Sequence, residues 1–88
     1  MTSVTISLKE NNIQKYNLAM SAIDPVIKKL ATHFNGSAEM GAFIAPGKPT
    51  LRADFNTEAD ADAFIKEVQV GEKFLAKKKF PGFNIQKN

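Results

Sequence analysis

The residues with the clearest chemical potential are lysines and phenylalanines near the C-terminal end of the chain. Residues 69–88 carry five lysines against one acidic residue, Glu72, whereas residues 1–68 carry seven basic and eight acidic side chains. Lysines can contact successive phosphates of a nucleic acid, and aromatic rings can stack on unpaired bases. We therefore expect binding of single-stranded RNA or DNA, with Lys73, Lys77, Lys78, Lys79 and Lys87 on phosphates and Phe80 and Phe83, or the nearby Phe74, on bases.

A second group of candidates lies in the middle of the chain. Gly41-Ala42-Phe43-Ile44 is similar in four residues to the aromatic strand motif of RNA recognition motif domains. It lacks the preceding Lys or Arg and the second aromatic residue, and it falls on the second expected strand rather than the third, so we assign no family. Phe43 alternates with Met40 and Ile44, so it is expected either on the open side of a sheet beside Arg52 or under a loop. Lys48, in an expected turn, is within reach of a ligand.

The same residues also have a purely structural interpretation. The lysines would then keep the protein in solution while the phenylalanines complete a small core. A tail that only adds a strand to the sheet would remove the stacking role of its phenylalanines.

Residues suited to catalysis or metal binding are few. The acidic cluster of Asp54, Glu58, Asp60 and Asp62 is explained by the positive end of a helix dipole. His33 is the only histidine and has no nucleophilic partner in the sequence pattern. Cysteine is absent, which excludes thiol catalysis and disulfides. We expect no enzyme, no metal and no cofactor.

Composition and length predict one small soluble domain. The chain has 88 residues, of which 43% are hydrophobic and 24% charged. Its first residues do not have the pattern of a secretory signal, and its apolar stretches are far too short to span a membrane. We expect a cytoplasmic protein that does not bind membranes.

The first half of the chain predicts a strand and a long helix. Val4, Ile6 and Leu8 alternate with polar residues, as in a half-buried strand. Seven large apolar residues then follow at alternating spacings of three and four, which places them on one stripe of a helix: Ile13, Tyr16, Met20, Ile23, Ile27, Leu30 and Phe34. Asn11 or Asn12 can cap this helix, Asn35-Gly36 can end it, and Pro25 should kink or restart it.

The second half predicts a hairpin and a second helix. Residues 38–45 and 50–55 alternate as two strands around the turn 46–49, with a possible bulge at Gly41. A helix capped by Asn56 or Thr57 follows, with Ala61, Phe64, Ile65 and Val68 on its buried face, and Gly71 can end it. Residues 72–88 remain ambiguous between a final strand that includes Phe74, a short helical turn and a tail.

This order of elements is that of a ferredoxin-like split β-α-β domain, with an antiparallel sheet and two helices on one face. We expect residues 1–71 to form a compact α+β domain and residues 72–88 to be its final strand or tail. Our first hypothesis is a small non-enzymatic nucleic-acid-binding accessory protein. The alternative is a module that binds and modulates or inhibits another macromolecule, as antitoxins and virus-encoded modulators of host factors do, and that uses surplus apolar surface on the first helix for a partner protein or a homodimer.

Overall fold

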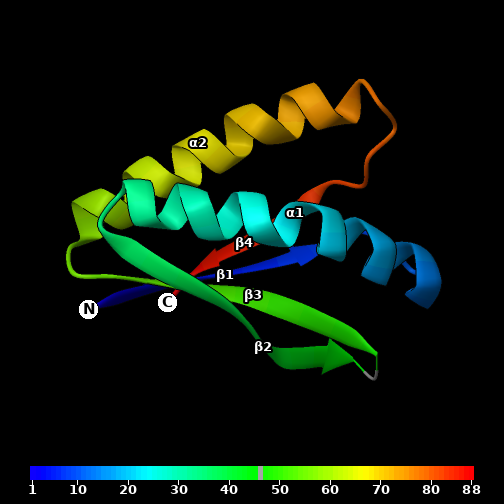
Figure 1. The fold of residues 1–88 in the computed structure, drawn as a ribbon, viewed down its shortest axis with the longest axis horizontal. Helices are drawn as coiled ribbons and strands as arrows, with labels where there is room; N and C mark the ends of the chain where they lie inside the picture. The colour runs from blue at the N-terminus through cyan, green and yellow to red at the C-terminus, as the bar shows by residue number, and fades with distance from the viewer. Residues whose placement is uncertain (46) are drawn as a thin grey trace.

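Four strands and two helices form a single two-layer structure. The computed structural model describes the backbone of residues 1–45 and 47–88 and the side chains of residues 1–41 and 47–88. Its elements are β1 (Thr2–Leu8), α1 (Ile13–His33), β2 (Gly36–Ala45), β3 (Lys48–Phe55), α2 (Glu58–Ala76) and β4 (Phe83–Lys87). The strands form one antiparallel sheet in the order β2-β3-β1-β4, and both helices cover the same face (Figure 1). The predicted ferredoxin-like arrangement is confirmed.

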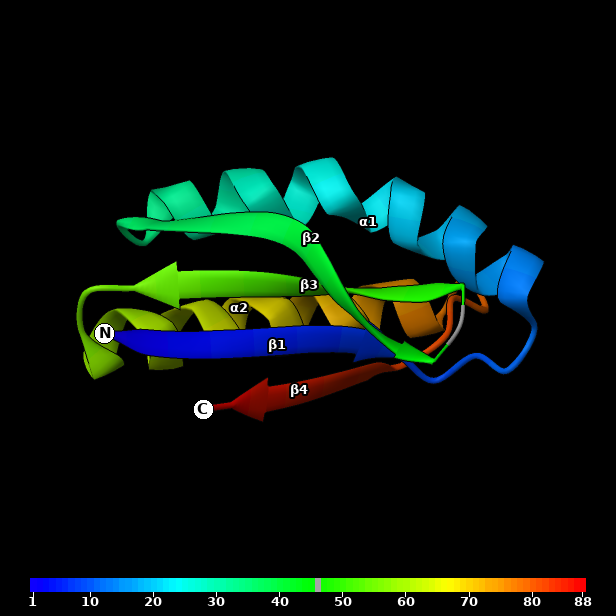
Figure 2. The same cartoon turned by 90° about the horizontal axis from the view of Figure 1, so that it is seen from below.

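The alternation of apolar and polar residues separates the two faces of the sheet. Ile6 lies opposite Leu51 on β3 and Ile85 on β4, and this set faces the helices. The helix side is closed by the buried residues Tyr16, Met20, Ile23, Ile27 and Ala31 of α1 and Ala61, Phe64 and Val68 of α2. The other face of the sheet is in front in Figure 2. Within the described part of the chain, neither helix is long and apolar enough to cross a membrane.

Helix α1 is one continuous element through Pro25, so of the two predicted outcomes, a kink or a restart, the restart is wrong. Asn12 caps its start, because its Oδ1 accepts a hydrogen bond from the Lys15 N–H at 3.0 Å. Pro25 is exposed, and a carbonyl that loses its helical partner on the solvent side can be hydrated instead. The apolar stripe keeps its register through the proline, so the sheet holds both halves of a helix that curves along its length (Figure 2).

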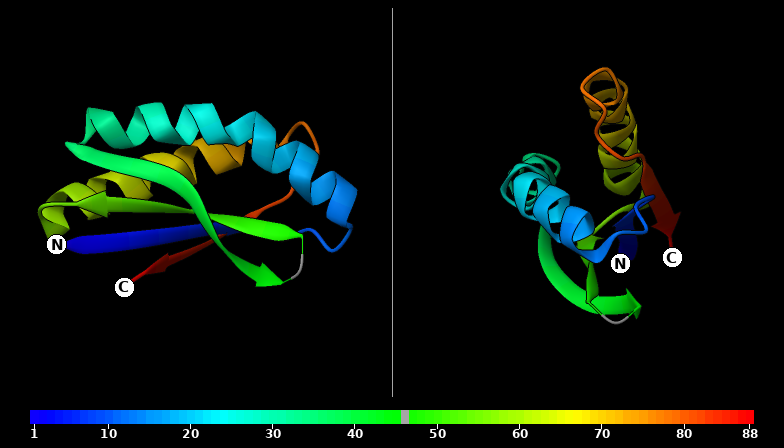
Figure 3. Two further views of the ribbon diagram at one scale, coloured as in Figure 1. Left: turned by 60° about the horizontal axis from the view of Figure 1, so that its bottom comes forward. Right: turned by 90° about the vertical axis from the view of Figure 1, so that its right-hand side faces the viewer.

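The predicted helix stop and hairpin bulge are both confirmed. Helix α1 ends at His33, and Asn35 takes a left-handed conformation with φ of 61°. Strand β2 then begins at Gly36. Its pairing with β3 shifts between Met40 and Phe43, where β2 carries one extra residue, and it shifts again before Ala45. Figure 3 shows how strongly the distal half of β2 twists away from the start of the strand.

Helix α2 extends beyond the end predicted at Gly71. Thr57 caps its start, accepting from the Asp60 N–H at 3.1 Å, and the helix continues to Ala76. One glycine costs a helix only about 1 kcal/mol, and Leu75 beyond it packs against the core. The boundary expected between residues 71 and 72 therefore lies inside α2. The final strand begins at Phe83, so Phe74 belongs to α2 and not to a strand.

The close approach of β2 to β3 gives a direct test of the packing. A Cβ atom on Gly36 would lie 2.5 Å from Phe55 Cδ1 and 2.7 Å from the Asp54 carbonyl oxygen. We expect Gly36→Ala to lower the free energy of unfolding by about 1–3 kcal/mol, measured by urea denaturation. Gly41→Ala, in the same strand, meets nothing within 4 Å and is the matched control. Equal effects of the two substitutions would contradict this account of β2.

Candidate nucleic-acid interface

The three consecutive lysines lie on a tight turn that closes α2. The Lys79 N–H donates to the Ala76 carbonyl and the Phe80 N–H donates to the Leu75 carbonyl, each at 3.1 Å. This pair of bonds is the Schellman motif, which places one residue in the left-handed region, normally glycine. Here that residue is Lys79, with φ of 61°. Lysine in this conformation costs roughly 1–2 kcal/mol, so the turn holds a lysine where glycine would be more stable.

Three further contacts attach this turn to the body of the protein. The Phe83 N–H donates to Glu72 Oε2 at 2.8 Å, and the Lys9 N–H donates to the Gly82 carbonyl at 2.7 Å. The rings of Phe80 and Phe83 meet edge to face, with their centroids 6.1 Å apart. Residues 77–82 are therefore a fixed connection between α2 and β4, and Lys9 at the end of β1 lies beside it.

Five exposed lysines gather at this end of the molecule without acidic partners. In the described part of the chain, ion pairs form only at Lys28, Arg52 and Lys87. The remaining exposed lysines around the turn, together with one exposed ring, are called the basic end. It consists of Lys9, Lys73, Lys77, Lys78, Lys79 and Phe74. The positive charges of the lysines at the end of α2 also interact favourably with the negative end of the helix dipole. These lysines therefore have a structural role in addition to any role in ligand binding.

The aromatic residues of this segment divide into one exposed ring and two packed rings. Phe74 is 65% exposed, and Lys77 Nζ lies 5.7 Å from the centroid of its ring. Phe83 is only 6% exposed and belongs to the core, and Phe80 packs partly buried against it. A base therefore has no free face of Phe83 on which to stack, because that ring is used for packing as the structural interpretation expected. Of the three rings for which stacking is predicted, Phe74 is the most exposed.

Lys87 is separated from the other predicted lysines. Its Nζ lies 2.8 Å from Glu58 Oε1 and 2.8 Å from Asp62 Oδ1, both at the start of α2. Hydrogen bonds to these two carboxylates raise the pKa of Lys87. The charge of Lys87 is thus matched locally, at the opposite end of α2 from the basic end.

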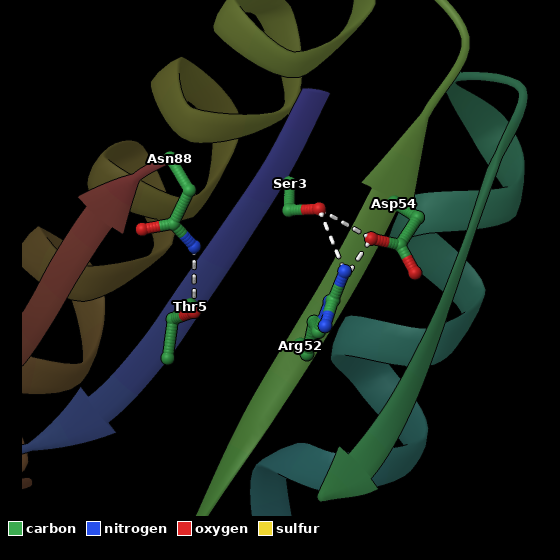
Figure 4. A network of polar contacts seen from close by, with 5 residues as sticks. All are labelled: Ser3, Thr5, Arg52, Asp54 and Asn88. Atoms are coloured by element: carbon green, nitrogen blue, oxygen red, sulfur yellow. Dashed lines mark hydrogen bonds and ion pairs between the residues drawn. The ribbon is translucent and has the colours of Figure 1, made fainter. Parts of the chain in front are cut away.

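Arg52 lies on the open face of the sheet, within a polar network rather than beside the lysines. Its Nε donates to Asp54 Oδ1 at 3.1 Å, and Ser3 Oγ donates to the same oxygen at 2.6 Å (Figure 4). Asn88 Nδ2 donates to Thr5 Oγ1 at 3.3 Å on the neighbouring strand. The hydrogen bond from Ser3, and after it the contact with Arg52, hold the pKa of Asp54 below its usual range.

The rest of the open face is polar wherever its side chains are described. Cross-strand partners share a face, so the register puts Ser7 with Asn84, Thr5 with Gln86, and Glu39 with Arg52 there. The Phe43 side chain, predicted as a base platform, lies outside the described residues. Lys48 begins β3 and its Nζ lies 5.9 Å from the centroid of the Tyr16 ring. Tyr16 itself is buried, which raises its pKa, and its hydroxyl donates to the Pro49 carbonyl at 2.7 Å.

Of the acidic candidates, Glu58 and Asp62 meet at Lys87, and Asp54 bonds to Ser3 and Arg52. Among the described residues, no three side chains of the types His, Cys, Asp and Glu gather in a way that could hold a metal ion. His33 is exposed in the last turn of α1 and contacts the Phe34 ring edge to face.

An apolar groove between the two helices is the feature that sequence reasoning missed. It has a volume of about 770 Å³ and is lined by Pro25, Val26, Lys29, Leu30 and His33 of α1, by Phe34, which caps this helix, and by Glu67 of α2. The apolar stripe of α1 predicted surplus surface, but the stripe itself is mostly core. The exposed large apolar residues of α1 are Ile13, at the start of the stripe, and Leu18 and Val26, which the spacing of three and four does not include. Lys9 was also missed, since only the pairing of β1 with β4 brings it to the turn.

The chain matches no protein-family model, no curated protein sequence and no solved structure among those compared.

The network around Asp54 predicts a pH-dependent contribution to stability. A lowered pKa means that this contribution is present above the ordinary aspartate value of about 3.9 and is lost as the pH falls through the folded-state value. Ser3→Ala should raise the Asp54 pKa toward its ordinary value, as measured by NMR titration of the carboxyl carbon. It should also lower the free energy of unfolding at neutral pH by under about 1 kcal/mol, because the site is partly exposed.

Thr5→Ala is the matched control for this test, because Thr5 bonds to Asn88 and not to Asp54. An Asp54 titration that Ser3→Ala leaves unchanged would contradict the role given to the Ser3 hydroxyl.

Proposed function

We propose that this protein binds single-stranded RNA or DNA through the basic end and performs no catalysis. The observation that carries the proposal is that the lysines of residues 73–79 are exposed and free of acidic partners in the described structure, and that three of them are held on an ordered turn. We also propose a cytoplasmic location, as expected from the sequence.

The geometry favours contacts to the phosphate backbone over reading of base sequence. The lysines carry point charges on flexible stems, which suit phosphates of any sequence. Phe74 offers one ring on which an unpaired base can stack, and base stacking on an aromatic ring tolerates every base. We therefore expect weak binding that depends little on sequence and prefers single strands.

The left-handed Lys79 adds a second line of support. Backbone strain of this kind persists where the surroundings hold it in place, and it often marks functional positions. Glycine at residue 79 would relieve the strain but would remove one charge from the basic end.

A protein-interaction module remains the second candidate function, and the groove between α1 and α2 is the observation that favours it. The groove is mainly apolar, and exposed Val26 lies on its wall. Such a surface suits a modulator or inhibitor of another macromolecule.

Binding to a labelled single-stranded oligonucleotide should depend steeply on salt. With about four lysines on phosphates, the log-log slope is about −3, so affinity falls about fifty-fold from 50 to 200 mM salt. Lys77→Gln with Lys78→Gln should reduce the slope by about 1.4, since each phosphate contact on a single strand contributes about 0.7. Fluorescence anisotropy measures both quantities.

Lys87→Gln is the matched control, because it removes a charge from the same terminal segment but at the other end of the molecule. Point substitutions are needed here, since removal of residues 72–88 would cut α2 and take Phe83 from the core. Absence of binding at 50 mM salt would overturn the proposal, and so would an equal loss from Lys87→Gln.

Replacement of Lys79 by glycine should have opposite effects on the stability of the fold and on oligonucleotide binding. We expect Lys79→Gly to raise the free energy of unfolding by about 0.5–1 kcal/mol, because glycine adopts the left-handed conformation without a steric cost. The same change should weaken oligonucleotide binding. Lys78→Gly removes the same charge next to the strained position, and it should lower both stability and affinity. Denaturation and anisotropy on the two variants test this, and a less stable Lys79→Gly would contradict the strain.

A further inference from the structure

Each of the two helices that form the groove carries an exposed apolar residue and a charged residue beside it, and the two charges are opposite in sign. On the α1 side, Lys29 and His33 stand beside Val26, which is 62% exposed. On the α2 side, Glu67 lines the groove, and Val70, one turn further on, is 44% exposed. Two exposed aliphatic residues beside a groove of about 770 Å³ are typical of a surface that another macromolecule covers.

The charges of the two walls are complementary to each other but are not paired within one chain. Lys29 and Glu67 line the same groove, yet neither belongs to an ion pair among the described residues. A partner that presents an acidic residue to α1 and a basic residue to α2 would match both walls. A second copy of this chain has these properties, because a two-fold interface brings each wall against the other.

We propose that the groove is the interface of a homodimer whose two-fold axis runs along the groove. The helices α1 and α2 run in opposite directions (Figure 1), and each rises by about 1.5 Å per residue. If Lys29 is level with Glu67, then Val26 is level with Val70. A two-fold axis along the groove preserves these levels and exchanges the walls. Lys29 of each copy therefore faces Glu67 of the other, and Val26 faces Val70.

This arrangement is independent of the nucleic-acid proposal and compatible with it. An axis along the groove leaves the basic ends of the two copies at the same end of the dimer, where both can contact one strand.

Sedimentation velocity over a series of protein concentrations tests the dimer. Lys29→Glu and Glu67→Lys alone should each weaken dimerisation about tenfold or more, because each creates two like-charge contacts. The double variant should restore dimerisation, since the two pairs reform with their signs exchanged. Val26→Glu should also abolish the dimer by placing a charge in its apolar part. Lys66→Glu, an exposed position next to Glu67 that does not line the groove, is the control for the charge change.

Circular dichroism establishes that each variant is folded, and rescue by the double variant excludes simple unfolding as the cause. A monomer at all concentrations would overturn the proposal and leave the groove to a different protein. A dimer that survives both single reversals, or one that the double variant fails to restore, would also overturn it.

Discussion

The pairing of β4 with β1 is the constraint on which the rest of the structure depends. Leu8 lies opposite Phe83 and Ile6 opposite Ile85, so the last strand completes one edge of the sheet beside β1, one of its two inner strands. The burial of Phe83 stabilises this edge by roughly 1.5–3 kcal/mol relative to an exposed ring. Because β4 is fixed at Phe83, the chain has only residues 77–82 in which to return from α2. A tight turn, rather than a free tail, is the result.

That turn determines where the charges of the protein lie. Glu72, the one acidic residue of the segment, is used to hold the Phe83 N–H, so it does not form an ion pair with a described lysine. Lys87 lies at the far end of β4 and is matched by two carboxylates at the start of α2. The lysines between these points are left exposed around the negative end of a helix. The charge asymmetry of the sequence thus becomes an asymmetry between two ends of the molecule.

Much of the fold could be predicted from the sequence, because its determinants are local. Alternation of Val4, Ile6 and Leu8 fixed the face of β1, and side-chain caps at Asn12 and Thr57 marked the helix starts. The features that could not be predicted depend on tertiary contacts. Packing of Leu75 carries α2 past Gly71, and pairing with β1 decides that the last strand begins at Phe83.

The features of the candidate site divide in the same way, into those that the local sequence indicates and those that depend on tertiary contacts. Composition alone was enough to select the lysines of residues 73–79, but not to show that Lys87 is paired or that Phe83 is buried. Those outcomes need the position of α2 relative to β4. Lys9 and the groove residues Val26 and Glu67 come from separate parts of the sequence, and only the folded arrangement brings them to the turn or to one surface.

The most direct test of the account is a two-dimensional amide NMR titration of the intact protein with a short single-stranded oligonucleotide at low salt. If the basic end binds the strand, shift changes will be concentrated at Lys9 and residues 73–79, with little change at Ser3, Thr5 and Gln86 on the open face of the sheet. Changes concentrated on the open face, or no changes at all, would contradict the assignment of the basic end as the nucleic-acid interface.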